Sequence, residues 1–274
     1  MPIAPSEPAA AQPEAATPAP DRPPGRARWT VQAVGSVRRW TESLLSLRIS
    51  REPDYAFVPG QYARLGLQAD GAEPVWRPFS MVSAPAERDA LEFVATLVPG
   101  GRFSEPLSRL GPGHPILVDC GAFGFLTADR VAPGSHLWLL ASGTGLGPFV
   151  SMLRDGAAVA GFESIVLVHS VRRAADLAYR DELETMARAD ARLRYLPVVT
   201  REPGASALAR RIPHLLEDGS LERAAGHALN AEDSRVLVCG NPELGTRMRA
   251  LLTARGLRTP RRGLSGQMAF ENYW

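Results

Sequence analysis

The first part of the chain alternates short apolar runs with breaks rich in Gly and Pro. Between residue 28 and about residue 119, runs of strand length occur at 29–34, 44–49, 61–67, 79–83, 91–98 and 115–120. Turn-forming segments such as QADGAEP and LGPGH separate these runs. Six short strands divided by turns are typical of a small antiparallel barrel or sandwich. We therefore expect an N-terminal antiparallel β-barrel.

The pattern changes at residue 136, where apolar strands begin to alternate with amphipathic helices. Strands are predicted at 136–141, 164–170, 193–200 and 235–240. Helices are predicted at 149–159, 175–189 and 242–256, with a short helix inside 210–221. Such alternation is typical of an α/β doubly wound parallel sheet. A length of 274 residues agrees with two domains, since a domain takes about 150 residues. We expect the domains at 28–130 and 131–274, with the boundary inside the segment 127–135.

Residues 1–27 differ in composition from both halves. The first 25 residues contain eight Pro and seven Ala and no apolar run. Such a segment cannot bury enough surface to offset the entropy of ordering it, so we expect a disordered tail. It has neither the apolar core of a secretory signal nor the Arg-rich character of a transit peptide. No run in the chain approaches the 18 or so apolar residues of a membrane span, and we expect a cytoplasmic protein with no membrane partner.

The charge balance argues against a nucleic-acid-binding face. The chain has no Lys, so its 31 basic residues are all Arg, and 29 Asp and Glu leave a net charge of +2. Binding several phosphates needs a basic stripe with few acids nearby. Cys120 and Cys239 lie far apart, and the five His have no ligand spacing, so we expect no metal site. A local group of Arg could still hold one phosphorylated small molecule.

Two strand ends in the predicted parallel sheet carry turns that suit a dinucleotide. The segment SGTGLGP (142–148) follows the first strand, and Asn241 and Pro242 follow the strand that ends at Gly240. Ligands of doubly wound sheets lie beyond the carboxyl ends of the strands, where a Gly-rich turn exposes N–H groups to a pyrophosphate. Because Pro148 occupies the last position of a G-x-G-x-x-G pattern, a tight turn without a ligand remains an alternative.

Several arginines lie just beyond strand ends in the same half: Arg172, Arg173, Arg201, Arg210 and Arg211. The guanidinium group suits a phosphate dianion, such as the phosphate on the ribose of NADP. For any one of them, an ordinary solvated surface in an arginine-rich protein is the alternative. Because several lie at one edge of the sheet, we expect NADP rather than NAD.

The barrel half contains two further segments that could hold a phosphate. Arg77-Pro78-Phe79-Ser80 begins a strand, and PGGRFSEPL (99–107) is a Gly turn that leads into a short helix. Ser104 is the expected N-cap of that helix, whose N-terminus could bind an anion. Each segment alone could be ordinary turn and cap chemistry.

Together these motifs resemble the ferredoxin–NADP reductase family, in its bacterial form that reduces ferredoxin or flavodoxin. The resemblance covers nearly all of residues 28–274. It rests on eight segments in order: RPFS (77–80), PGGRFSEPL (99–107), ASGTGLGP (141–148), LVHSVRRAADLAY (167–179), VVTRE (198–202), RRIP (210–213), LVCGNPEL (237–244) and FENYW (270–274). It implies an enzyme that holds FAD between the two domains and passes electrons between NADPH and ferredoxin or flavodoxin. Hydride transfer between nicotinamide and flavin N5 would be followed by single-electron transfer.

The resemblance also implies which residues bind FAD. Arg77 would bind its pyrophosphate, Phe79 would stack on the flavin ring, and Ser80 would lie near flavin N5. Phe79 departs from the family pattern, which has Tyr at this position, so a hydrogen bond from that hydroxyl is lost. The other FAD-binding residues implied are Pro78, Val94, Ala95, Thr96, Arg102, Phe103, Ser104, Thr144, Tyr273 and Trp274. Tyr273 and Trp274 would cover the flavin site.

The nicotinamide side follows in the same way. The residues that the resemblance implies for NADP are Gly143, Gly145, Arg172, Arg173, Thr200, Arg201, Arg211, Gly240, Asn241 and Pro242. The expected catalytic residues are Ser80, Cys239 and Glu271, with Glu271 handling a proton. Cys239 would pack against the nicotinamide ring, although a buried core cysteine at a strand end explains it equally well.

Two other functions remain open from the sequence. The first is the reductase component of an oxygenase system, but such chains carry a cysteine-rich iron–sulfur domain and this chain has two Cys. The second is a flavin-binding redox sensor or interaction subunit without catalysis. For the reductase we expect a monomer that meets its electron partner transiently.

Overall fold

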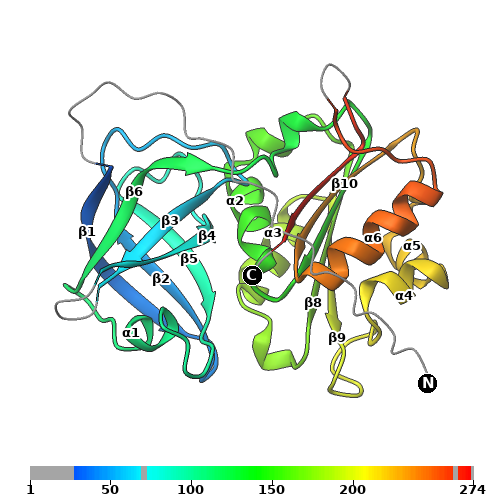
Figure 1. Cartoon of the computed structure of the whole chain (residues 1–274). Coiled ribbons are helices and arrows are strands. Elements are labelled where there is room, and N and C mark those ends of the chain that lie inside the picture. The colour runs from blue at the N-terminus through cyan, green and yellow to red at the C-terminus, as the bar shows by residue number, and fades with distance from the viewer. Residues whose placement is uncertain (1–27, 69–72, 262–264, 273–274) are drawn as a thin grey trace, which may run out of the picture.

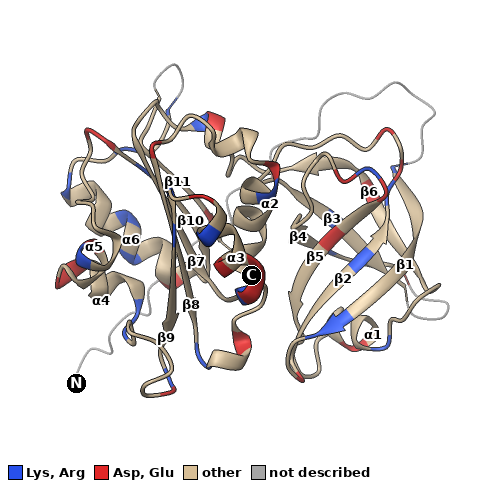
Figure 2. Ribbon diagram, turned by 180° about the vertical axis from the view of Figure 1, so that it is seen from behind, with Lys and Arg blue, Asp and Glu red and all other residues tan. Residues whose placement is uncertain are grey.

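Two β-sheets organise the protein, one in each half (Figure 1). The structure is a computed structural model that describes residues 28–68, 73–261 and 265–272. Arginines and acidic residues are interspersed over both halves in Figure 2 rather than gathered into one basic stripe. No helix in the described ranges is long and apolar enough to cross a membrane.

The N-terminal half is a six-stranded antiparallel sheet in the order β4-β3-β6-β1-β2-β5. Its elements are β1 (Trp29–Arg39), β2 (Leu44–Ser50), β3 (Tyr62–Leu67), β4 (Val75–Ser80), β5 (Ala90–Thr96), α1 (Ser104–Ser108) and β6 (Pro115–Phe123). The predicted antiparallel β-barrel is confirmed. The strand predicted at 79–83 is displaced, because β4 begins at Val75 and ends at Ser80.

The interior of the barrel is filled by the apolar positions of these strands. Leu47, Ile49, Leu65, Phe93 and Ile116 belong to one cluster and are almost completely buried. Burying a side chain of this size contributes about 1.5–3 kcal/mol. The alternation of such residues with polar ones therefore determines which face of each strand turns inward.

Strands β4 and β5 are the two edges of the barrel sheet. An isolated bridge joins Met81, the residue after β4, to Phe93 of β5. Beyond that bridge, at residues 94–96, β5 is paired with β2 on one side and has an open edge on the other. The barrel is thus splayed where β5 approaches the second half of the chain.

The C-terminal half is a five-stranded parallel sheet in the order β11-β10-β7-β8-β9. Its strands are β7 (His136–Ser142), β8 (Ser164–Val171), β9 (Leu193–Val199), β10 (Ser234–Gly240) and β11 (Met268–Asn272). Helices α2 (Gly147–Asp155) and α3 (Arg180–Ala189) cover the face toward the barrel, and the opposite face carries α4 (Ile212–Glu217), α5 (Ser220–Ala225) and α6 (Pro242–Ala254) (Figure 1). The predicted doubly wound parallel sheet is confirmed.

The strand order places β7 in the centre, with β8 and β9 on one side and β10 and β11 on the other. The chain therefore changes direction across the sheet between β7 and β10, which pair along their whole length up to Ala141 and Cys239. In doubly wound sheets, a crevice opens at this point beyond the carboxyl ends of the two strands. The turns after Ser142 and Gly240 flank it.

The structure differs from the prediction in three places. The helix predicted from residue 175 begins only at Arg180, because Tyr179 adopts a left-handed conformation with φ 59° that interrupts the helix. The short helix predicted inside 210–221 is present as α4, but a second helix, α5, begins in the same segment because Gly219 with φ 73° separates the two. Strand β11 was not predicted, and it extends the sheet by pairing with β10.

An ion-pair cluster joins the two halves. Arg154, near the end of α2, contacts Glu92 of β5 at 2.8 Å and Glu182 of α3 at 2.7 Å. Tyr179 donates a hydrogen bond from its hydroxyl to the other Glu92 oxygen at 2.8 Å. Burial and the carboxylate raise the pKa of Tyr179, which keeps the hydroxyl protonated. We call Glu92, Arg154, Tyr179 and Glu182 the interdomain clasp.

Candidate functional site

A cavity of about 550 Å³ lies at the carboxyl ends of the parallel strands. It is lined from the C-terminal half by Ser142, Gly143, Thr144, Ser170, Val171, Arg172, Asp176, Thr200, Arg201, Arg211, Ile212, Pro213, Gly240, Asn241, Pro242, Glu243, Leu244 and Arg247. Ser43, Leu44 and Thr96 close it from the barrel. The cavity therefore lies at the switch point of the sheet and is shared between the two halves.

The Gly-rich turn approaches β10 more closely than a side chain would permit. A Cβ atom on Gly145 would lie 2.3 Å from the carbonyl oxygen of Cys239, and one on Gly240 would lie 2.1 Å from Oγ of Ser142. Gly143, which lines the cavity, has φ 56° and open space where a Cβ atom would stand. Gly145 and Gly240 therefore allow the two backbones to pack closely, and Gly143 takes up a left-handed conformation and leaves its backbone open to the cavity.

A buried histidine holds the turn in place. His169 of β8 contacts the carbonyl oxygen of Gly143 through Nε2 at 3.1 Å. Burial lowers the pKa of His169 to about 4, so the ring is neutral and donates this hydrogen bond at neutral pH. The sequence motifs did not single out His169, which in the sequence is an ordinary residue of a buried strand.

Asn241 and Pro242 have local structural roles besides lining the cavity. The side-chain oxygen of Asn241 accepts a hydrogen bond from the N–H of Leu244 at 2.8 Å, which makes Asn241 the N-cap of α6. Its backbone N–H donates to Oγ of Ser142 at 3.1 Å. This links the turn after β10 to the turn after β7.

Two arginines face the cavity without an acidic partner. Arg172 follows β8 and Arg201 follows β9, and a backbone hydrogen bond of 2.9 Å from Arg201 N to Arg172 O holds the two segments together. In the ranges that the structure describes, neither guanidinium makes an ion pair. Thr200 beside them donates its hydroxyl to the carbonyl oxygen of Val171 at 3.0 Å. The cavity thus has one wall with two uncompensated positive charges.

Two more arginines line the cavity, and both are paired. Arg211 contacts Glu243 at 2.7 Å, and Arg247 contacts Glu217 at 3.3 Å. Glu243 and Arg247 were not predicted as site residues. They lie four positions apart on α6 and so share one face of that helix. This spacing is visible in the sequence and could have pointed to both residues.

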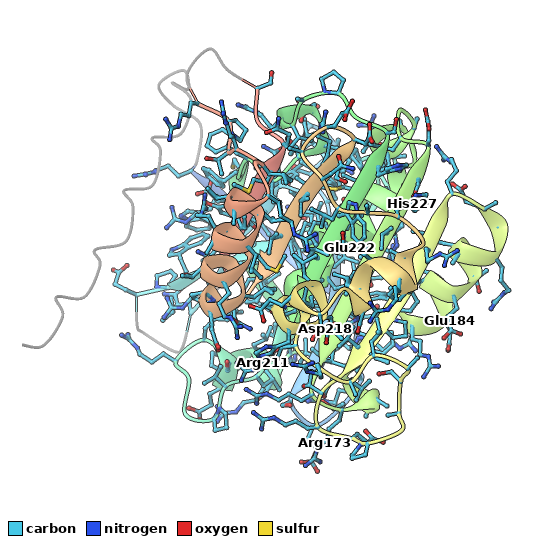
Figure 3. All side chains as sticks on the ribbon, turned by 90° about the vertical axis from the view of Figure 1, so that its right-hand side faces the viewer. Arg173, Glu184, Arg211, Asp218, Glu222 and His227 are labelled. Carbon is cyan, nitrogen blue, oxygen red and sulfur yellow. The ribbon has the colours of Figure 1, made fainter. Side chains whose placement is uncertain are left out.

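Three residues assigned to this region by resemblance do not line the cavity. Gly145 and Cys239 are buried, and Cys239 belongs to the core beneath the sheet. Arg173 points outward at the lower edge of the molecule in Figure 3, and its backbone N–H donates to Asp176 at 3.1 Å. The geometry therefore gives no support to direct contacts from Arg173 or from the thiol of Cys239, and the alternative of a core cysteine agrees with its burial.

A second group of residues meets where the two halves touch. Ser80 of β4 donates its hydroxyl to Oε1 of Glu271 on β11 at 2.9 Å, although the two residues are 191 positions apart. Burial raises the pKa of Glu271 from its ordinary value of 4.5 to about 7, and the hydrogen bond from Ser80 partly opposes this rise. Gly124 adjoins the pair, since a Cβ atom there would lie 3.0 Å from Glu271 Oε2. Glu271 can therefore hold or release a proton near neutral pH.

The barrel segments that were predicted to bind phosphate lie next to each other. The rings of Phe79 and Phe103 are in contact at 5.3 Å between centroids, which places the strand end at 77–80 against the segment 102–104. Arg77 and Arg102 are exposed beside these rings, and no acidic partner is found for either among the described residues.

The expected cap of α1 is corrected by the structure. Ser104 is the first residue of α1, and the N-cap position belongs to Phe103, which makes no side-chain cap. The hydroxyl oxygen of Ser104 instead accepts a hydrogen bond from the N–H of Val98 at 2.9 Å. Ser104 therefore closes the Gly turn at 98–104 rather than the end of the helix.

The remaining predicted residues fall into two sets. Val94 and Ala95 have buried side chains on β5, so only their backbone faces the open edge of the sheet, while Thr96 and Thr144 line the cavity. Tyr273 and Trp274 lie outside the described residues. Among the described residues, no group of three or more His, Cys, Asp or Glu is arranged to hold a metal ion.

Known protein families match both halves of the chain. Residues 39–125 match the oxidoreductase FAD-binding domain, and residues 139–249 match the oxidoreductase NAD-binding domain. A flavodoxin/ferredoxin–NADP reductase of Escherichia coli (strain K12) is 42% identical over 221 residues, which is 80% of this chain and 87% of the relative. A ferredoxin–NADP reductase of Pseudomonas aeruginosa is 34% identical over 250 residues, 88% and 95% of the two chains.

A solved structure agrees with these relatives. The crystal structure of a ferredoxin NADP+ reductase from Neisseria gonorrhoeae with bound FAD and NADP matches with a TM-score of 0.85 at 34% identity. The match covers 90% of this chain and 99% of that one. The resemblance inferred from eight short motifs is confirmed: the chain belongs to the ferredoxin/flavodoxin–NADP reductase family.

Proposed function

We propose that the chain is a FAD-dependent oxidoreductase that passes electrons between NADPH and ferredoxin or flavodoxin. The observation that carries this proposal is the arginine-lined cavity at the switch point of the parallel sheet, which the barrel closes on one side. Relatives that this chain matches over 87% and 95% of their length carry this activity in their names, and one solved relative holds FAD and NADP. Residues 28–130 would bind FAD and residues 131–274 would bind NADPH.

The barrel has the features that FAD requires. Arg77 and Arg102, which have no acidic partner among the described residues, would bind the pyrophosphate, since guanidinium groups pair well with phosphate oxygens. The open edge of β5 at 94–96 leaves backbone N–H and C=O groups for hydrogen bonds to the cofactor. Phe79 would supply an apolar ring face beside Phe103. Bound FAD would accept a hydride from NADPH and release its two electrons one at a time.

The cavity in the second half suits a phosphorylated nicotinamide dinucleotide. The N–H groups of the turn at 143–146 and the start of α2 would face its pyrophosphate. Arg172 and Arg201 would bind the 2′-phosphate, with Thr200 between the two strand ends and Arg211 across the cavity. Leu44 and Thr96 of the barrel line the same cavity, so a nucleotide bound there would reach the boundary between the two halves.

Ser80 and Glu271 would serve the reaction at that boundary. Ser80 can donate its hydroxyl either to Glu271 or to an acceptor beside the open edge of the barrel. Glu271, with a pKa of about 7, is able to bind a proton at neutral pH and give it up again. We propose that the pair holds the proton that accompanies electron transfer, and that the chain works as a cytoplasmic monomer meeting its electron partner transiently.

The test is a visible spectrum of the purified protein, followed by anaerobic titration with NADPH and, in parallel, NADH. We expect a flavin absorbance that NADPH bleaches at a lower concentration than NADH does. A protein that contains no flavin after purification and after incubation with FAD, or a flavin that NADPH leaves unchanged, refutes the proposal.

A second assay separates this function from the alternatives. Reduction of cytochrome c by NADPH is measured with and without added ferredoxin or flavodoxin. A rate that rises severalfold with the carrier supports the reductase, and a flavin that is reduced but passes nothing on supports a redox sensor. The two cysteines of the chain are fewer than the four thiolates that an iron–sulfur cluster of an oxygenase reductase uses.

A further inference from the structure

The four arginines of the cavity are not equivalent. Arg172 and Arg201 have no acidic partner in the described ranges, whereas Arg211 is bound to Glu243 at 2.7 Å. Glu243 is itself part of the cavity wall, and its side chain is 60% exposed, against 57% for Arg211. A carboxylate therefore stands inside the group of positive charges that would bind the phosphate of NADPH.

The position of Glu243 follows from the start of α6. Asn241 caps the helix, Pro242 is its first residue and Glu243 its second. The first turn of a helix is a favourable place for a carboxylate, because the unpaired N–H groups there carry partial positive charge. Glu243 thus lies in the cavity wall at the start of α6, one helical turn before Arg247.

The other acidic group of the cavity wall is engaged with backbone. Asp176 accepts a hydrogen bond from the N–H of Arg173 at 3.1 Å. Glu202, which follows Arg201 in the sequence, accepts one from the N–H of Ala174 at 2.9 Å. Glu243 differs from both because its recorded partner is the guanidinium of Arg211.

The carboxylate of Glu243 would interact differently with the 2′-phosphate of NADPH and with the 2′-hydroxyl of NADH. To contact Arg211, a phosphate dianion must displace or approach Glu243, and the two like charges repel. A ribose hydroxyl instead can donate a hydrogen bond to Glu243, as acidic residues do in sites that take NAD. The same ion pair therefore penalises the phosphorylated nucleotide and assists the unphosphorylated one.

We infer that Glu243 is a specificity-determining residue that reduces the preference of this chain for NADPH over NADH. The inference rests on the proposed function, because it concerns the same cavity. Arg172 and Arg201 give the cavity its preference for a 2′-phosphate, and Glu243 weakens that preference by occupying Arg211.

The test compares Glu243→Gln, Glu243→Asp and the unchanged holoenzyme with NADPH and NADH as reductants. Glu243→Gln is expected to raise kcat/KM for NADPH about threefold, as befits the loss of one exposed charge, and to lower kcat/KM for NADH. Glu243→Asp keeps the charge and is expected to resemble the unchanged protein. The effect of Glu243→Gln should shrink as salt is raised, because the charges are exposed.

Glu184→Gln is the matched control. Glu184 forms an ion pair of the same length, 2.7 Å, with Arg180 on α3, and it is not among the residues that line the cavity. Figure 3 shows Glu184 on the opposite side of the view from Arg211. This variant removes one negative charge from the same domain and is expected to leave both kcat/KM values unchanged.

Binding of 2′-AMP, measured by calorimetry, separates this inference from the proposed function. Its dissociation constant should fall about threefold in Glu243→Gln and remain unchanged in Glu184→Gln. If the dissociation constant of 2′-AMP falls in Glu243→Gln but the protein oxidises no NADPH, the inference about Glu243 stands and the reductase function is refuted. An unchanged NADPH-to-NADH ratio, or weaker binding of 2′-AMP in Glu243→Gln, overturns the inference, since the latter would mean that Glu243 positions Arg211 for the phosphate.

Discussion

Removing Arg154 should destabilise the protein more than removing any exposed arginine. In the interdomain clasp, the Arg154 side chain is 16% exposed and that of Glu92 is 8% exposed. Taking away one partner of a buried ion pair costs about 3–5 kcal/mol, because the other charge stays buried. Glu92 would keep the hydroxyl of Tyr179 and a longer contact of 3.3 Å to Arg48, and Glu182 is one-third exposed. We therefore expect Arg154→Met to lower the free energy of unfolding by about 2–3 kcal/mol.

The measurement is urea denaturation of the holoprotein at pH 7, followed by fluorescence and by circular dichroism. Arg180→Met is the control, because Arg180 and Glu184 form an exposed pair of 2.7 Å that should contribute less than about 0.5 kcal/mol. The double variant Arg154→Met, Glu92→Gln should be more stable than the sum of the two single changes implies, since residue 92 then carries no buried unpaired charge. The reasoning is refuted if Arg154→Met and Arg180→Met lower stability equally.

Three further predictions concern the site itself. Burial raises the pKa of Glu271 to about 7 from 4.5, so its charge destabilises the folded state above pH 7 and this penalty is lost as the pH falls toward 4.5. Glu271→Gln should therefore raise the free energy of unfolding at pH 8 by about 1–3 kcal/mol and have little effect at pH 5; a difference that does not vary with pH contradicts this. Gly145→Ala places a Cβ atom 2.3 Å from the Cys239 carbonyl oxygen and should cost about 2–4 kcal/mol through the shift that β10 must make, which an unchanged melting temperature would disprove. Arg201→Gln should weaken binding of 2′-AMP about 10-fold or more, because a charge-assisted hydrogen bond contributes about 1.5–3 kcal/mol, and NADH should be unaffected; equal losses for both nucleotides would remove Arg201 from the phosphate site.

The sequence predicted the architecture well because the two halves have different periodicities. Alternating short strands gave the barrel, and buried strands such as residues 164–170 between helices gave the parallel sheet. Strand β11 was missed because its five residues carry no strong apolar pattern: Met268 is buried, the next three residues are partly buried and Asn272 is exposed. Its partner β10, buried along its whole length, is what makes a strand of that segment.

Site residues could be predicted only where they belong to a short segment whose position at a strand end can be read from the sequence. The Gly-rich turn and the arginines after β8 and β9 could be placed from strand ends, because the carboxyl ends of parallel strands share one edge. The contact between Ser80 and Glu271 depends on how the two domains pack together, and the sequence gives no direct sign of that packing. The left-handed Tyr179 is similar, since a bulky residue adopts such a conformation only when surrounding contacts compensate for it. The pairing of Arg211 with Glu243 likewise required the packing of α4 beside α6.

Helix α2 connects two features that have been treated separately. It begins at Gly147, directly after the turn at the cavity, and carries Arg154 of the interdomain clasp one residue before its end. Nine residues form a rod of about 13 Å, which is too short to bend appreciably. A movement of the barrel that shifts Arg154 would therefore be transmitted along α2 to the nucleotide turn. Any effect of the angle between the domains on nucleotide affinity would be reciprocal, because coupling between two equilibria acts equally in both directions.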